Sequence, residues 1–90
     1  MKKEFKPNVQ VLGRIAEEFY QNNLIKKTHL HSASRTDWNS FEKYLSWMKN
    51  KNYVECKIDG KEHKYQSTSM GQEMFNMILK LREHVKTAKL

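Results

Sequence analysis

The sequence is poor in cysteine, proline and glycine, and it contains no long apolar run. Its 90 residues include one cysteine, one proline and three glycines. The single Cys56 excludes a disulfide within the chain and is typical of a reducing compartment; we expect it to be buried as a small apolar group. No apolar stretch approaches the roughly 20 residues that span a bilayer, and the first ten residues lack the apolar middle of a secretory signal. We therefore expect one cytoplasmic domain with a single modest core.

The residue groups that carry catalysis or hold metals are also missing. The sequence has no glycine-rich phosphate loop, nucleophile motif or paired carboxylates. His29 and His31 lie only two positions apart, and Cys56 with His63 supplies two ligands where a structural zinc site needs four. We expect no enzyme activity, no cofactor and no metal.

Positive charge is what the sequence has in excess. The net charge is +7 and the isoelectric point is near 9.6. Basic residues outnumber acidic ones at the N-terminus, between residues 26 and 35, and after residue 67, whereas residues 9–25 are slightly acidic. This distribution favours a polyanionic partner, although many solvated surfaces are also rich in lysine.

Apolar residues at helical spacing predict four helices. These cover about residues 9–22, residues 27–34, the stretch between Asp37 and Asn52, and a long segment from Met70 towards the C-terminus. Asn8 and Asp37 are good N-caps, and Asn52 tolerates the left-handed conformation that often follows a helix. Ser67-Thr68-Ser69 supplies the cap of the last helix.

Between the last two helices the sequence predicts a β-hairpin. Asp59-Gly60 separates two β-prone runs and is typical of a two-residue turn with positive φ. The register that follows pairs Ile58 with Lys61, Lys57 with Glu62, Glu55 with Lys64, Val54 with Tyr65 and Cys56 with His63. Opposite charges would then share one face and mostly apolar groups the other. The order α-α-α-β-β-α, mostly helical with a small hairpin, is the plan of a winged helix-turn-helix with a long C-terminal helix.

The third helix carries two tryptophans that cannot share a face. Trp38 falls on the core side with Phe41, whereas Trp47 lies on the flank. We expect Trp38 to be core and Trp47 to pack under the C-terminal helix or the N-terminal segment. Contact with a partner and stacking on a DNA backbone are the alternatives for Trp47. The polar face opposite the core consists of Asn39, Lys43, Ser46 and Asn50.

Short motifs between about Lys26 and Leu81 match a known pattern. They are Lys27-Thr28 at the start of the second helix, Tyr44-Leu45 in the third helix, and Tyr65, Thr68 and Gly71 at intervals of three. In these motifs the chain resembles the small archaeal winged helix-turn-helix proteins, which include regulators and chromatin proteins that dimerise through a coiled coil. The resemblance implies binding to duplex DNA as a dimer, and a nucleoid-associated location in a prokaryote.

Under this hypothesis the third helix enters the major groove and the hairpin touches the DNA backbone. Asparagine can bond adenine bidentately, and lysine can reach guanine or a phosphate. The candidate DNA-binding residues are Lys26, Lys27, Arg35, Asn39, Ser40, Lys43, Ser46, Asn50 and Lys61. For the helix residues, an ordinary solvated face is the alternative. Lys2, Lys3 and Lys6 form a basic arm that either follows a groove or is simply solvated.

The C-terminal helix has a wider apolar stripe than one small core requires. Part of it repeats at alternating spacings of four and three, as in a coiled-coil seam. The predicted dimerisation residues are Met70, Met74, Met77, Leu81, His84 and Ala88. Four others are expected to dock on the domain: Phe75, Ile78, Leu79 and Val85.

We therefore divide the chain into residues 1–69, a winged-helix domain with a basic arm, and residues 70–90, a helix for docking and homodimerisation. The predicted function is that of a transcriptional regulator that binds duplex DNA. The alternatives are a chromatin-type architectural protein and a protein-interaction module that uses Trp47 and the long helix.

Overall fold

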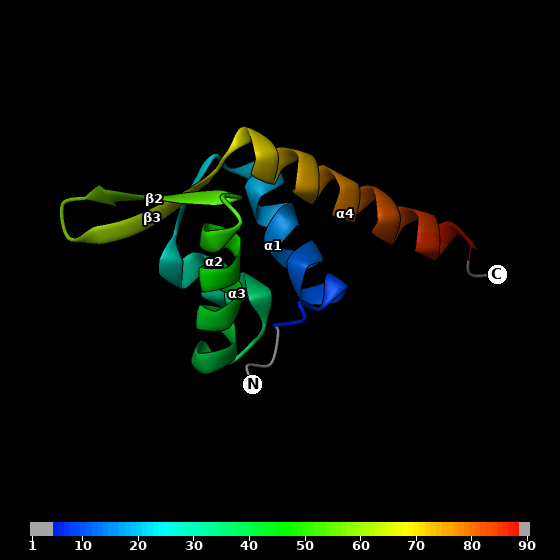
Figure 1. Ribbon diagram of the computed structural model, residues 1–90, viewed down its shortest axis with the longest axis horizontal. Coiled ribbons are helices and arrows are strands. Elements are labelled where there is room, and N and C mark those ends of the chain that lie inside the picture. The colour runs from blue at the N-terminus through cyan, green and yellow to red at the C-terminus, as the bar shows by residue number, and fades with distance from the viewer. Residues whose placement is uncertain (1–4, 89–90) are drawn as a thin grey trace.

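The protein is a small helical domain with a three-stranded sheet at one side. The computed structural model describes residues 5–88, and the side chains of residues 5–84. The elements are α1 (Val9–Gln21), β1 (Leu24–Lys26), α2 (Lys27–Ser34), α3 (Trp38–Asn50), β2 (Val54–Asp59), β3 (Glu62–Ser67) and α4 (Ser69–Ala88). The β2–β3 hairpin projects from one end of the molecule and α4 runs away from the other (Figure 1). In this described part, no helix combines the length and apolarity needed to cross a bilayer.

The predicted helices are confirmed, and so are their predicted ends. The Asn8 side chain accepts hydrogen bonds from the amides of Gln10 and Val11 at the start of α1. The Asp37 carboxylate accepts one from the Ser40 amide at 2.8 Å, and hydrogen bonding to Ser40 lowers the pKa of that carboxyl below its usual value. Asn52, just beyond α3, has the predicted positive φ of 63°.

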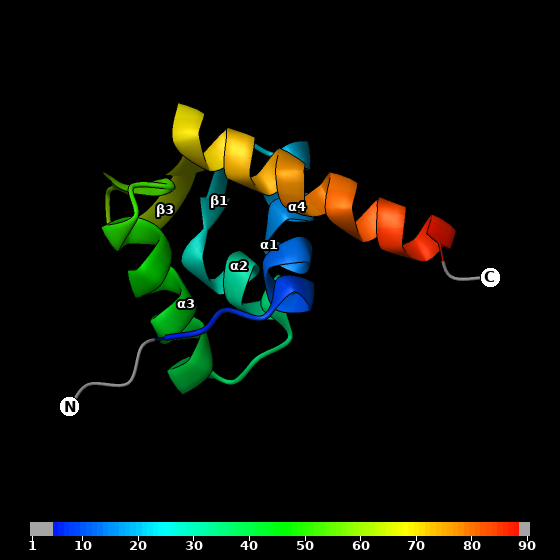
Figure 2. The same ribbon diagram turned by 45° about the vertical axis from the view of Figure 1, so that its right-hand side comes forward.

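The core lies where α1, α2, α3 and the sheet meet, and α4 lies across α1 (Figure 2). Its centre is made of Ile15, Ala16, Leu30, Phe41, Leu45 and Met48, all at most 2% exposed. Phe75 docks α4 as predicted, because its ring stacks on Phe19 with a centroid distance of 5.1 Å. Tyr65 joins the core from β3, and burial raises the pKa of its hydroxyl to about 12.

The sheet contains one strand more than predicted, and its order is β1-β3-β2. The short β1 pairs antiparallel with β3, so that Ile25 lies opposite Tyr65. Three residues are too few to show an alternating pattern, which is why the sequence predicted only a connection here.

The hairpin is confirmed, but its predicted register is wrong by two residues. The loop consists of Gly60 and Lys61, and Asp59 pairs with Glu62. Gly60 has φ 64°, whereas Asp59 stays extended within β2. The first loop residue needs a positive φ, which glycine adopts without strain. With Gly60 at this position, Asp59 does not need a positive φ.

The shifted register replaces the predicted cross-strand pairs. Val54 lies opposite Ser67, Cys56 opposite Tyr65, Ile58 opposite His63, Glu55 opposite Gln66 and Lys57 opposite Lys64. Cys56 is exposed rather than buried, because the hairpin extends beyond the core at this point. Its thiol still lies 3.7 Å from Nδ1 of His63, along a diagonal of the ladder.

Of the two tryptophans of α3, one differs from the prediction and the other agrees with it. Trp38 is 45% exposed and not core, because it is the first residue of α3 and lies at the edge of the domain. It stacks on His31 at a ring distance of 3.9 Å. Trp47 packs against Phe5 and Tyr53, which confirms its predicted contact with the N-terminal segment.

The start of α4 lies directly on the connection between α3 and β2. The Thr68 amide donates to the Tyr53 carbonyl at 3.0 Å, and the Thr68 hydroxyl donates to the Asn52 carbonyl at 2.7 Å. The same hydroxyl accepts the Gly71 amide at 2.9 Å, which caps the helix. The Thr68 and Gly71 positions of the sequence motif are thus explained by this close junction.

Candidate nucleic-acid interface

The outer face of α3 is polar and open to solvent. Asn39, Lys43, Ser46 and Asn50 are all exposed, on the side away from the buried Phe41. Ser40 is half-buried beside the Asp37 cap. The helix therefore presents two amides, a hydroxyl and an ammonium group at intervals that a groove could receive.

The turn that sets α3 against α2 is held by hydrogen bonds. The buried Ser34 hydroxyl donates to the His31 carbonyl and lies 2.9 Å from the Thr36 hydroxyl. Arg14 of α1 donates through Nε to the Ser34 carbonyl at 3.0 Å. Arg35, inside this turn, takes a left-handed φ of 57° and is exposed. These bonds fix the angle between α2 and α3 and leave the guanidinium of Arg35 at the surface.

A shallow cleft connects the start of α2 with the tip of the hairpin. Its volume is about 280 Å³, and it is lined by Lys26, Lys27, Thr28, Lys61, Glu62 and His63. The structure thus brings three predicted lysines together from segments more than 30 positions apart. His63 is a member that the sequence did not predict, because its place beside α2 depends on the true register and on β1. The cleft gathers positive groups around the first turn of α2.

Two of these lysines are held by carboxylates. Lys26 lies 2.8 Å from Glu62, and this hydrogen-bonded pair raises the pKa of Lys26 and lowers the pKa of Glu62. Lys27 lies 2.8 Å from Glu42 of α3, and its ammonium is 5.9 Å from the Trp38 ring. The Lys27–Glu42 pair places the cleft next to the polar face of α3. Exposed pairs of this kind contribute only about 0–1 kcal/mol, so a phosphate could replace either carboxylate.

The face of the sheet that points away from the core carries a row of lysines. Lys64 of β3 lies opposite Lys26 of β1 on one side and Lys57 of β2 on the other. Lys64 is paired diagonally with Asp59 at 3.3 Å. Arg35, Lys43, Lys57 and Lys61 are among the cations that form no ion pair within the part of the chain that the structure describes.

Four of the predicted dimerisation residues, Met74, Met77, Leu81 and His84, line an apolar groove along α4. Met74, Met77, Ile78 and Leu81 line it, with Lys80 and His84 at its edge. Met77 is 69% exposed and Leu81 is 50% exposed, and Met70 is also exposed. Ile78 and Leu79 are half-buried against the core, as predicted for docking. The side chains of Val85 and Ala88 lie outside the described residues, as do Lys2 and Lys3, whereas Lys6 is exposed.

Among residues 5–84, no three side chains of His, Cys, Asp or Glu lie close enough together to hold a metal ion. The fold and its exposed polar helix are those of a winged helix-turn-helix. A family model described as winged helix-turn-helix matches residues 10–86, and the chain belongs to this family. None of the curated proteins matches the sequence.

Solved structures with the same fold come from bacteria and archaea. A MarR family transcriptional regulator from Silicibacter pomeroyi superposes with a TM-score of 0.73 at 15% identity, over 89% of this chain and 57% of its own. This chain therefore spans little more than half the length of that regulator.

Two archaeal structures match over most of their own length. Sso10a-2, a DNA-binding protein from Sulfolobus solfataricus, has a TM-score of 0.68 at 16% identity, over 93% of this chain and 90% of its own. AF1382 from Archaeoglobus fulgidus has a TM-score of 0.72 at 17% identity, over 86% and 85%. At these identities the similarity shows the fold.

Proposed function

We propose that this protein is a non-enzymatic, duplex DNA-binding transcriptional regulator that inserts α3 into the major groove. The observation that carries this proposal is the contact between α3 and the lysine-lined cleft. Through the Lys27–Glu42 pair, the exposed polar face of α3 adjoins a cleft lined by Lys26, Lys61 and His63. A helix that reads bases needs phosphate contacts beside it to fix its register, and this arrangement supplies both.

The base-reading residues are Asn39, Lys43, Ser46 and Asn50, with Ser40 at the edge of the face. The phosphate contacts are made by Arg35 at one end of α3 and by Lys26, Lys27 and Lys61 in the cleft. The early amides of α2 have no side-chain cap, so they can also donate to a phosphate in the cleft. Glu42 pairs with Lys27 in the free protein, and a phosphate that takes its place on Lys27 would leave this carboxylate beside the DNA, where it opposes binding.

A salt-dependent duplex shift assay tests DNA binding. With about four phosphates neutralised, affinity should fall about 100-fold between about 50 mM and 200 mM salt. Absence of binding at about 50 mM salt would refute the proposal. Lys61→Ala should weaken binding to every duplex and reduce the salt slope by about one, while Lys80→Ala on α4, once sedimentation shows that its oligomeric state is unchanged, should change neither.

Base reading by α3 requires a separate experiment. A preferred duplex is first selected from a random library, and its affinity is compared with that of an unrelated duplex. The double variant Asn39→Ala, Lys43→Ala should reduce this discrimination at least about tenfold. The matched control is Asn76→Ala, Lys80→Ala, which removes the same residue types at the same spacing from an exposed face of α4; sedimentation first verifies that its oligomeric state is that of the unmodified protein. Equal discrimination in the test variant and the control would show that α3 does not read bases.

The same selection separates a regulator from a chromatin-type architectural protein. A regulator prefers its site over unrelated DNA by about a thousandfold or more. An architectural protein binds all duplexes with nearly equal affinity and the same salt slope, and this result would favour the second function.

We further propose that the protein acts as a homodimer through α4. The exposed Met77 and Leu81 lie in one groove, and an apolar surface of this kind along a 20-residue helix favours pairing with a second copy. Sedimentation equilibrium should give twice the chain mass, and Leu81→Glu should give the monomer mass. Asn76→Glu on the same helix is the control. If the unmodified protein is a monomer at about 100 µM, this assignment is wrong, because a dimer stable enough to act on DNA should form at such a concentration.

A further inference from the structure

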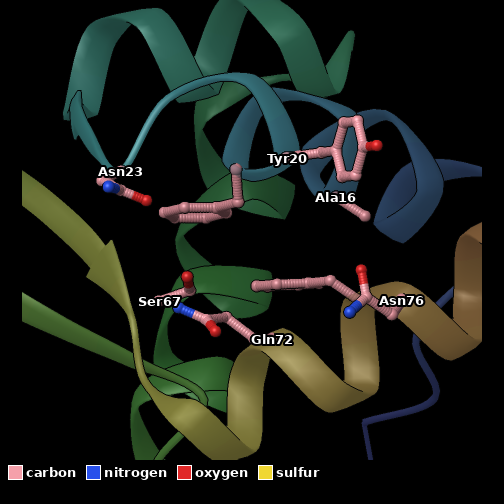
Figure 3. A pocket seen from close by; sticks show the side chains of 8 residues that line it. Ala16, Tyr20, Asn23, Ser67, Gln72 and Asn76 are labelled. Atoms are coloured by element: carbon pink, nitrogen blue, oxygen red, sulfur yellow. The ribbon is translucent and has the colours of Figure 1, made fainter.

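A second cavity lies at the junction of α1, the end of β3 and the first turns of α4 (Figure 3). Its volume is about 240 Å³. None of its lining residues comes from α2, α3 or the hairpin tip, so it is separate from the proposed DNA-binding surface.

The apolar wall of the cavity consists of two stacked rings. Phe19 of α1 and Phe75 of α4 are nearly parallel, with an interplanar angle of 9°, and both are buried. Because the two rings cover each other's faces and are only 5% and 3% exposed, a further flat ring reaches them at their edges. The wall is contributed by two different helices, so a bound ring would contact both.

The polar side chains of the cavity form no hydrogen bond with any side chain or backbone group among the described residues. Ser67 is only 7% exposed, yet its hydroxyl forms no hydrogen bond with any residue in the described part of the chain. The hydroxyl oxygen is not enclosed, since Nε2 of His31 is the only fully buried side-chain polar atom without a partner among the described residues, so the Ser67 hydroxyl stays open to the cavity. Asn23 and Gln72 lie near Ser67 at one end of the cavity, and Asn76 lies towards the other end (Figure 3). Their amides likewise bond to nothing among residues 5–84.

Among the residues that the structure describes, no charged side chain lines this cavity, and this favours an uncharged ligand. An ion would have to leave water without a counter-charge, whereas a neutral group could exchange hydrogen bonds with Ser67 and the amides. The volume lies below the range of about 300–1000 Å³ that is common for drug-sized ligands, so the ligand must be small.

We propose that this cavity binds a small neutral molecule that has one or two flat rings and an amide-like edge. The ring lies against Phe19 and Phe75, and the edge bonds to the Ser67 hydroxyl and the Gln72 amide. The proposal does not depend on DNA binding, and each can fail without the other.

Benzamide is the probe that tests the proposal, since it combines one flat ring with a neutral amide. In a titration followed by ¹⁵N–¹H spectra, it should shift the amide signals of Ser67, Gln72, Phe75 and Asn76 in a saturable way, below about 10 mM. Benzoate has the same shape with a negative charge, and toluene has the ring without the amide. Both should bind at least about threefold more weakly.

A matched pair of serine variants identifies the hydrogen bond. Ser67→Ala should weaken benzamide binding about three- to tenfold, while Ser69→Ala, two residues further along and outside the cavity, should leave it unchanged. Gln72→Leu, at an exposed position that does not support the core, should weaken it by a similar factor. The absence of saturable shifts, equal binding of toluene, or full binding by both Ser67→Ala and Gln72→Leu would each overturn the proposal.

Discussion

Two glycines lie where α4 meets the rest of the domain, and they differ in what surrounds them. At Gly71, near the start of α4, an added methyl carbon would lie 1.8 Å from the Tyr53 carbonyl oxygen. At Gly13 of α1, the nearest atom to such a carbon would be Nη1 of Arg82, at 2.8 Å. The first contact is between two backbones, whereas the second involves the end of a flexible side chain. The start of α4 is therefore fixed by the main chain, and its later turns rest on side chains that can adapt.

The largest effect is expected from Gly71→Ala. The new methyl group cannot coexist with the Tyr53 carbonyl, so α4 must move away and break the Thr68 bonds to the α3–β2 connection. We expect a loss of at least about 3 kcal/mol of unfolding free energy, at the upper end of overpacking effects, and a Tm lower by at least about 12 °C. Urea and thermal unfolding measure this loss. A decrease of less than about 1 kcal/mol in the free energy of unfolding would show that α4 can move away from Tyr53 with little loss of stability. Gly71 would then not differ from Gly13.

The helices were predictable from sequence because their signals are local. Asn8, Asp37 and Asn52 each act on the backbone within a few residues, and the structure uses all three as predicted. The close approach at Gly71 was visible only as a motif residue, since the atom it meets belongs to Tyr53, far away in the sequence. Local chemistry thus fixes the ends of the elements, while the contacts between elements require the fold.

The hairpin register and the surface cleft also depend on contacts between elements, which the sequence alone did not predict. The residues Asp59, Gly60 and Lys61 permit two turn positions, and cross-strand charge pairing favoured the wrong one. The observed register is held at the base of the hairpin, where β1 pairs with β3 and Ile25 lies opposite the buried Tyr65. That same pairing brings Lys26 next to Glu62 and so builds the cleft. The lysines of the candidate site could be predicted one by one, but not their grouping.

A much smaller effect is expected from Gly13→Ala. Alanine favours an α-helix over glycine by about 0.8–1 kcal/mol, and Arg82 can move its guanidinium aside at the cost of its exposed pair with Glu17. The net change should be a stabilisation of between 0 and about 1 kcal/mol in the same unfolding assays. The Arg82→Ala background removes the obstructing side chain, so there the substitution should stabilise slightly more. A destabilisation above about 1 kcal/mol in both backgrounds would mean that α1 and α4 are as rigidly joined at Gly13 as at Gly71.

The smallest effect on stability is expected from Asp37→Asn, at the start of α3. The Asp37 cap is exposed, whereas the Thr68 cap of α4 is partly buried. Hydrogen bonding to Ser40 lowers the pKa of Asp37 in the folded state. The ionised carboxylate therefore stabilises the fold at pH values above its unfolded pKa of about 4, and this contribution is lost as the pH falls through the lower folded pKa. Asparagine also caps helices well, so Asp37→Asn should lower the Tm only slightly near neutral pH, and the difference from the unmodified protein should shrink below about pH 4. Glu55→Gln, at an exposed position away from any helix end, controls for the loss of one negative charge in a basic protein. A Tm difference that stays constant down to about pH 3 would show that the Asp37 carboxylate does not stabilise α3 through its charge.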